Sequence, residues 1–281
     1  MTDAKLIPGF EERFAEAKAC RVRYFVGGPE SAPPIVLVHG LGGSAANWVD
    51  VAPLLATTRR VLVPELPGHG LSTPLPAVPN LGVFADRVAI VAEREQALPA
   101  AIVGHSLGAV VALRLALRRP RDVNALVLAA AAGISSTSRR ARYGLRILAI
   151  IGPRRLVAPW ADSVARSPFL RYAVFGHWGA SDPLIMSTAA VDGFLDGTRL
   201  TSDSVSAARA VVIDDVRPEL RELGCPTLVL WGARDNQLPL VDAFEFARRL
   251  DARLRVIADC GHLLIGERPD LCAEAIEAFL G

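Results

Sequence analysis

The stretch PAAIVGHSLGAVVALRLALRRPR, residues 99–121, predicts a strand, a tight turn and a buried helix in succession. Residues 100–103 form a short apolar run, which the letters GHSLG at residues 104–108 interrupt. Residues 109–117 then have an almost wholly apolar helical pattern, which Pro120 ends. The turn between strand and helix is therefore the first place to look for a functional side chain.

This turn has the pattern Gly-x-Ser-x-Gly, and the chemistry of serine explains each position. A serine hydroxyl is a poor nucleophile unless it is held clear of the backbone, and a sharp, strained strand-to-helix turn does this for Ser106. Gly104 and Gly108 leave the room that such a turn requires. The amide of Leu107 points out of the helix N-terminus, where unpaired N–H groups favour a developing negative charge. The turn resembles the nucleophile elbow of the α/β-hydrolase fold family.

Length and composition predict a globular protein with one large core. The chain has 281 residues, of which 51% are hydrophobic and 21% charged, and its net charge is +2. Most of its basic residues are arginines, and they are scattered through helical patterns rather than gathered in one patch. We therefore expect no nucleic-acid partner.

The N-terminus and the cysteines bear on location and on metals. The opening MTDAKLIPGFEE lacks the basic and apolar regions of a signal peptide, and no apolar run reaches the length of a membrane span. The four cysteines (Cys20, Cys225, Cys260 and Cys272) have no CxxC spacing, which argues against a zinc site or a redox motif. We expect a cytoplasmic protein with reduced thiols, no stable membrane insertion and no metal.

Apolar runs alternate with helical patterns along most of the chain. Two candidate strands at residues 12–17 and 21–26 form an antiparallel lead-in. The remaining strands are expected at residues 35–38, 61–63, 100–103, 125–128, 227–231 and 254–257, and helices at residues 47–55, 81–97, 109–117, 218–223, 240–250 and 269–280. Continuously apolar strands of this kind predict a mostly parallel sheet covered by helices on both faces, with ligands bound at the carboxyl ends of the strands.

The alternation is interrupted between residues 134 and 206. This segment has no convincing strand, begins rich in arginine and carries many aromatic side chains. The arginines are Arg139, Arg140, Arg142, Arg146, Arg154 and Arg155, and the aromatics are Trp160, Phe169, Tyr172, Phe175, Trp178 and Phe194. We interpret residues 134–206 as an inserted helical cap, and residues 1–133 and 207–281 as the core domain.

A serine nucleophile needs a histidine base and an acid that orients it. Of the five histidines, only His262 lies in a loop just after a late strand, from which it can reach the sheet edge near Ser106. The other four (His39, His69, His105 and His177) are interpreted as packing or loop-shaping residues. Asp235 follows the strand at residues 227–231 and is the favoured acid, whereas Asp214, Asp215 and Asp259 are weaker candidates. The order Ser106, Asp235, His262 matches the order of nucleophile, acid and histidine in the family.

The resemblance also implies where a substrate carbonyl oxygen would be held. In the family, a backbone N–H after the first His-Gly pair faces this oxygen, and Leu41 occupies that position here. Leu41 and Leu107 would then form the oxyanion hole through their backbone N–H groups. The resemblance implies a hydrolase that needs no cofactor.

A rival interpretation arises in the same loop. Residues 40–45, GLGGSA, satisfy the GxGxxA pattern of a dinucleotide-binding turn, and Glu65 follows about twenty residues later, where such a fold places an acidic residue. This alternative explains neither GHSLG nor the segments that contain Asp235 and His262. We therefore favour the hydrolase interpretation over the nucleotide one.

The resemblance implies hydrolysis of carboxylic esters through an acyl-enzyme intermediate, on small to medium hydrophobic substrates. A thioesterase, a lactonase or a C–C bond hydrolase would use the same residues, as would a perhydrolase or cofactor-free haloperoxidase. A ligand receptor built on the hydrolase scaffold is a remote further alternative. The cap and the pocket determine which of these substrates such a hydrolase takes.

Overall fold

The computed structural model describes residues 7–17, 19–76, 80–135, 158–176 and 179–281. Within these residues an eight-stranded sheet has the order β1-β2-β4-β3-β5-β6-β7-β8. β1 pairs with β2, and β2 with β4, in antiparallel fashion, and the other pairs are parallel. The strands are β1 (Glu11–Glu16), β2 (Arg21–Gly27), β3 (Pro34–Val38), β4 (Arg60–Pro64), β5 (Ala100–His105), β6 (Val123–Ala129), β7 (Thr227–Gly232) and β8 (Arg253–Ile257).

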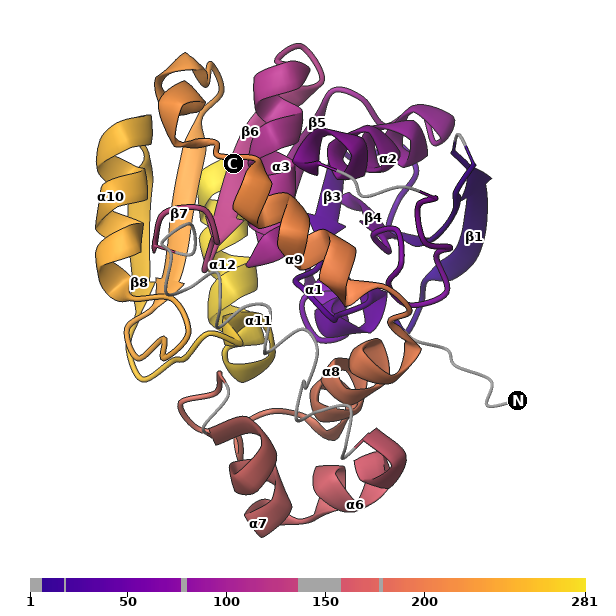
Figure 1. Ribbon diagram of the computed structural model, residues 1–281, viewed down its shortest axis with the longest axis vertical. Helices are drawn as coiled ribbons and strands as arrows, with labels where there is room; N and C mark the ends of the chain where they lie inside the picture. Colours follow the sequence, from indigo (N-terminus) through magenta and orange to yellow (C-terminus); the bar gives the residue numbers. More distant parts are fainter. Residues whose placement is uncertain (1–6, 18, 77–79, 136–157, 177–178) are drawn as a thin grey trace.

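Helices cover this sheet on both faces, as the apolar strands predict. Every residue of β5 and of β7 is buried, which requires a packed layer on each side of the sheet. α2 (Leu81–Arg94) packs against α3 (Leu107–Arg118), and α1 (Ala52–Leu55) packs against α12 (Pro269–Leu280). α10 (Leu240–Leu250) lies on β7 and β8 (Figure 1). The α/β fold and its parallel sheet are therefore confirmed.

Two predicted helices are wound more tightly than their patterns suggest, and one of them is also broken in two. The helix expected at residues 47–55 is a 3-10 turn, η1 (Ala45–Trp48), followed by the single turn of α1. Pro53 explains this break, because a proline inside a helix removes a backbone donor and disfavours helix in the preceding residue. The helix expected at residues 218–223 is likewise a 3-10 helix, η5 (Arg217–Glu222), that begins beside Pro218.

The described residues between 158 and 206 form helices and connecting turns at one end of the molecule (Figure 1). They comprise η3 (Ala158–Trp160), α6 (Ala161–Arg166), α7 (Pro168–Arg171), η4 (Tyr172–Gly176), α8 (Thr188–Leu200) and the start of α9 (Ser204–Ile213). α6 packs on α7 and α8, and α8 packs on η1. The predicted boundary at Ser206 falls inside α9. The arginines at 139–155, His177 and Trp178 lie outside the described residues.

No helix in the described part of the chain is both long enough and apolar enough to span a membrane.

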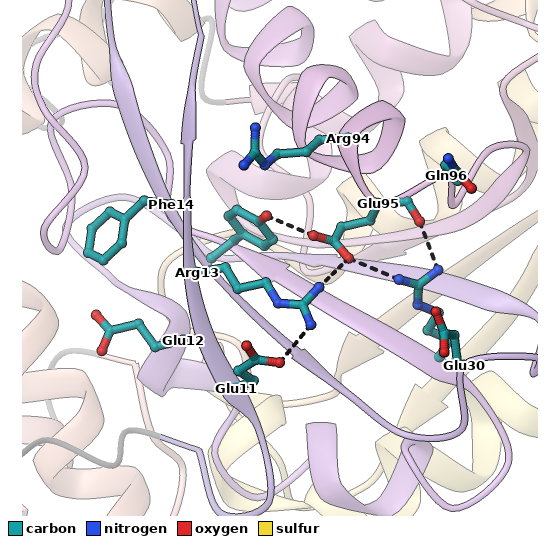
Figure 2. Close-up of a pocket in the computed structure, with 10 residues that line it drawn as sticks. Glu11, Glu12, Arg13, Phe14, Glu30, Arg94, Glu95 and Gln96 are labelled. Carbon is teal, nitrogen blue, oxygen red and sulfur yellow. Dashed lines mark hydrogen bonds and ion pairs between the residues drawn. The ribbon is translucent and has the colours of Figure 1, made fainter.

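A buried carboxylate ties the antiparallel edge of the sheet to α2. Glu95, just after α2, accepts hydrogen bonds from Arg13 (2.7 Å), Arg60 (2.9 Å) and the Tyr24 hydroxyl (2.7 Å). Only 6% of its side chain is exposed. Figure 2 shows Glu95 pointing toward Arg13 of β1, which also pairs with Glu11. This cluster joins β1, β2, β4 and α2.

We expect Glu95→Gln to lower the free energy of unfolding by about 2 kcal/mol, because it removes the buried anion that the guanidinium groups of Arg13 and Arg60 share. Urea unfolding at pH 7 measures this change. Glu16→Gln is the matched control, because the Glu16 side chain is 83% exposed and lies 4.0 Å from Arg21. The control should stay within about 0.5 kcal/mol of the parent chain. Equal stability of the two variants would contradict a structural role for Glu95.

Candidate active site

Ser106 lies at the sharp turn between β5 and α3. Its backbone has φ 54° and ψ −113°, a strained conformation for a residue other than glycine. A Cβ on Gly104 would lie 2.3 Å from the Gly108 carbonyl oxygen, and one on Gly108 would lie 2.2 Å from the Val38 carbonyl oxygen. Only glycine fits at either position. The turn therefore has the tight geometry that the Gly-x-Ser-x-Gly pattern predicts.

The structure brings Asp235 and His262 to the same edge of the sheet as Ser106. His262 Nε2 lies 3.1 Å from Ser106 Oγ, and His262 Nδ1 lies 2.8 Å from Asp235 Oδ2. The side chains of His262 and Asp235 are 4% and 0% exposed. These residues, far apart in sequence, meet because each follows the carboxyl end of a parallel strand. Ser106 follows β5, Asp235 follows β7 and His262 follows β8.

The second oxygen of Asp235 fixes the direction of the carboxylate. Oδ1 accepts N–H groups from Gln237 and Leu238, each at 2.8 Å, so Oδ2 is left to face His262. An ionised carboxylate only accepts hydrogen bonds, so His262 Nδ1 carries the proton and Nε2 is free to accept one from Ser106. The arrangement can move a proton from the serine hydroxyl to the imidazole.

The three weaker candidates for the acid form ion pairs with arginines. Asp259 is 63% exposed in its side chain and pairs with Arg234. Asp214 pairs with Arg114, and Asp215 pairs with Arg217. None of these contacts involves His262, so Asp235 is the carboxylate that the histidine meets.

The loop that contains Leu41 packs directly against the serine. A Cβ on Gly40 would lie 3.2 Å from the Cβ of Ser106. The loop turns at Gly42, which has φ +68°, and the turn is closed by the bond from Gly43 N–H to the Gly40 carbonyl (3.1 Å). Leu107 is the first residue of α3, where backbone N–H groups have no partner within the helix. The Leu41 loop therefore reaches Ser106 through Gly40, and Leu107 directly follows Ser106 in the chain.

Comparison with known proteins agrees with this geometry. The sequence model of the Alpha/beta hydrolase family matches residues 35–275. The chain belongs to the α/β-hydrolase family. The family match includes Ser106, Asp235 and His262 as well as the segment between residues 134 and 206.

Proteins named as an esterase and as hydrolases resemble this α/β-hydrolase over most of its length. It is 32% identical to the pimeloyl-[acyl-carrier protein] methyl ester esterase of Aromatoleum aromaticum, over 87% of this chain and 97% of that protein. It is also 32% identical to the 2-hydroxymuconate semialdehyde hydrolase of a Pseudomonas species, over 88% and 86% of the two chains. The structure of a hydrolase from Pseudomonas aeruginosa PA01 superposes with a TM-score of 0.77 at 25% identity, covering 96% of this chain and 98% of that one.

In this α/β-hydrolase the other described histidines shape loops. His39 accepts the Leu66 N–H at Nε2 (2.9 Å), and its Nδ1 lies 2.8 Å from the Gly40 carbonyl oxygen. Burial, aided by the nearby His69, lowers the pKa of His39 to about 3, so its ring is neutral at pH 7. Burial likewise lowers the pKa of His69 to about 4. His105 bonds through Nε2 to the His262 carbonyl (2.9 Å).

Glu65, the acidic residue of the dinucleotide alternative, is turned inward. Its side chain is wholly buried and accepts N–H groups from Leu71 (2.7 Å) and Ala45 (3.3 Å). The Gly-rich loop leads into the short η1 rather than the long helix of a dinucleotide site. Glu65 braces the loops of the α/β-hydrolase core, and its buried side chain is not exposed for contact with a nucleotide ribose.

The burial of Glu65 makes stability depend on pH. Burial raises the pKa of Glu65 to about 7, although Arg23 and the two N–H groups act in the opposite direction. The folded chain therefore holds this proton more tightly than the unfolded chain, whose carboxyl pKa is about 4.3. The free energy of unfolding should consequently fall as the pH rises from about 4.5 to 7.

We expect Glu65→Gln to remove about 2–3 kcal/mol of this fall between pH 5 and 8, because glutamine does not titrate. Urea unfolding of both proteins across this range measures the difference. Parallel pH profiles for the two proteins would show that Glu65 does not titrate in this window.

Proposed function

We propose that this α/β-hydrolase is a serine esterase that cleaves carboxylic esters of small to medium hydrophobic substrates through an acyl-enzyme intermediate. The observation that carries the proposal is the continuous hydrogen-bonded series from Ser106 Oγ through His262 to Asp235, with distances of 3.1 and 2.8 Å. The similarity to a protein named as a methyl ester esterase supports the choice of an ester as substrate.

In the proposed mechanism, His262 takes the proton from Ser106 as the hydroxyl oxygen attacks the ester carbonyl carbon. Asp235 orients the imidazole and stabilises its charged form. The backbone N–H groups of Leu41 and Leu107 stabilise the oxyanion. One such donor is typically worth about 3 kcal/mol in the transition state. The alcohol leaves with the proton from His262, and water then releases the acid by the reverse sequence of steps.

We further propose that residues 134–206 are a cap over this site and that residues 1–133 and 207–281 are the catalytic core. α8 supports this division, because it packs on η1 directly after the Leu41 loop. Its Phe194 would lie 2.8 Å from a Cβ on Gly266, four residues after His262. The aromatic side chains of this segment, Phe194 among them, support the choice of uncharged, hydrophobic esters as substrates.

A panel of p-nitrophenyl esters of graded acyl length tests the proposal. We expect turnover that rises from acetate to medium acyl chains and is lost after treatment with an organophosphate. The absence of ester turnover above the background hydrolysis rate would contradict the esterase assignment.

A second candidate, hydrolysis of a thioester, a lactone or a C–C bond, uses the same three residues. The 32% identity to the 2-hydroxymuconate semialdehyde hydrolase is the observation that favours it. Parallel assays on a thioester, a lactone and a semialdehyde substrate of that kind decide between the two. A kcat/KM at least tenfold higher on one of these than on the best ester would favour the second candidate.

A further inference from the structure

Glu267 is a buried carboxylate beside the proposed active site, and the mechanism proposed above does not use it. It ends the single helical turn α11 (Leu264–Glu267), and the residue is 2% exposed. Oε1 accepts the N–H of Gly261 (3.0 Å), and Oε2 accepts those of Ser181 (2.7 Å) and Asp182 (3.2 Å). The carboxylate therefore bonds to backbone on two separate segments of the chain.

One of these segments contains His262. Gly261 immediately precedes it, and Leu263, which follows it, donates its N–H to the Gly179 carbonyl (3.1 Å). The contact is close, because a Cβ on Gly261 would lie 2.4 Å from the Gly179 carbonyl oxygen. The backbone on both sides of His262 is thus fixed to residues 179–182.

A carboxylate suits this position better than an amide. Three N–H groups converge on two oxygens, so both oxygens must accept hydrogen bonds. An amide offers one acceptor oxygen and an NH₂ group that only donates, so it would place that NH₂ against at least one backbone N–H. Burial raises the pKa of Glu267, while the N–H groups of Asp182, Ser181 and Gly261 act in the opposite direction.

We propose that Glu267 is a positioning residue that holds the backbone of His262 against residues 179–182, so that the imidazole keeps its distance from Ser106 Oγ. The inference rests on the proposed function, because it assigns Glu267 a role through His262. Glu267 itself touches no reacting atom. It sets the angle at which the imidazole approaches the hydroxyl, and a displacement of about 1 Å there can cost on the order of 100-fold in rate.

The test is Glu267→Gln, assayed on the best p-nitrophenyl ester. We expect kcat to fall about 10- to 100-fold while KM changes less than about threefold, because the change affects the base and not the acyl pocket. The downfield proton resonance of the His262–Asp235 hydrogen bond should shift or broaden. A residue with only a structural role would leave that resonance unchanged in the folded variant.

Glu95→Gln is the matched control, because Glu95 is also a buried carboxylate but lies at the opposite, antiparallel side of the sheet. It should lose stability and keep kcat. Gly261→Ala perturbs the same contact from its other side and should reproduce the loss of kcat, which provides a second test if Glu267→Gln does not fold.

Ser106→Ala in the same assay separates the two proposals. If Ser106→Ala abolishes turnover while folded Glu267→Gln or Gly261→Ala keeps kcat within twofold, the role of Glu267 is wrong and the esterase proposal stands. If Ser106→Ala keeps turnover, the proposed function itself fails. A fall in kcat in Glu95→Gln equal to that in Glu267→Gln would assign the effect to stability and overturn the inference.

Discussion

Replacement of Ser106 by alanine should lower kcat for ester hydrolysis by about 10⁴-fold or more. The change removes the oxygen that would attack the carbonyl carbon and leaves the donors of Leu41 and Leu107 in place. Alanine keeps the Cβ of serine, so the strained turn at φ 54° should persist and the melting temperature should change little. Steady-state kinetics with a matched thermal melt measure both quantities.

The control for this serine-to-alanine change is Ser31→Ala. Ser31 is exposed and precedes β3, at the amino ends of the parallel strands and therefore on the edge of the sheet opposite Ser106. This variant should keep full activity. A Ser106→Ala protein whose kcat lies within tenfold of the parent enzyme would show that the Ser106 hydroxyl is not the nucleophile.

Replacement of Asp235 by asparagine should cost nearly as much, about 10⁴-fold in kcat. Gln237 and Leu238 donate N–H groups to Oδ1, so the asparagine oxygen is expected to take that place and the amide NH₂ to face His262. His262 Nδ1 must then accept a hydrogen bond, which moves the ring proton to Nε2. In that tautomer the imidazole cannot take the proton from Ser106.

Asp259→Asn is the matched control, since Asp259 lies near His262 in sequence but is exposed and paired with Arg234. Its backbone has φ 49°, which asparagine tolerates well. We expect this variant to keep its rate. A near-normal rate for Asp235→Asn together with a large loss for Asp259→Asn would reverse the assignment of the acid.

The sequence predicts the parallel sheet and the three site residues because each depends on a local pattern. Ser106 follows from two glycines that only a tight turn requires, and Asp235 and His262 follow from their places directly after apolar strands. The parallel sheet then brings the three residues together, because the carboxyl ends of its neighbouring strands meet at one edge. These expectations need no knowledge of how distant surfaces pack.

The sequence does not predict contacts between distant segments, because no local pattern encodes them. Gly193 and Gly197 of α8 lie so close to η1 and its preceding loop that a Cβ would come within 2.4 Å of the Ala46 oxygen and 2.8 Å of the Gly43 carbonyl carbon. No periodicity indicates which surface α8 meets. Glu267 has only a weak local signal, an acidic residue at the end of the apolar run LLIG, whose partners at residues 181 and 182 lie far away in sequence.

Reaction with a fluorophosphonate, followed by intact mass and peptide mapping, tests the central claim most directly, since such reagents label a serine whose proton an adjacent base removes. The account predicts one adduct per chain, located on Ser106 and formed in parallel with loss of ester turnover. It also predicts no adduct in Ser106→Ala. Labelling of another residue with loss of turnover, or undiminished turnover in fully labelled Ser106 protein, would contradict it.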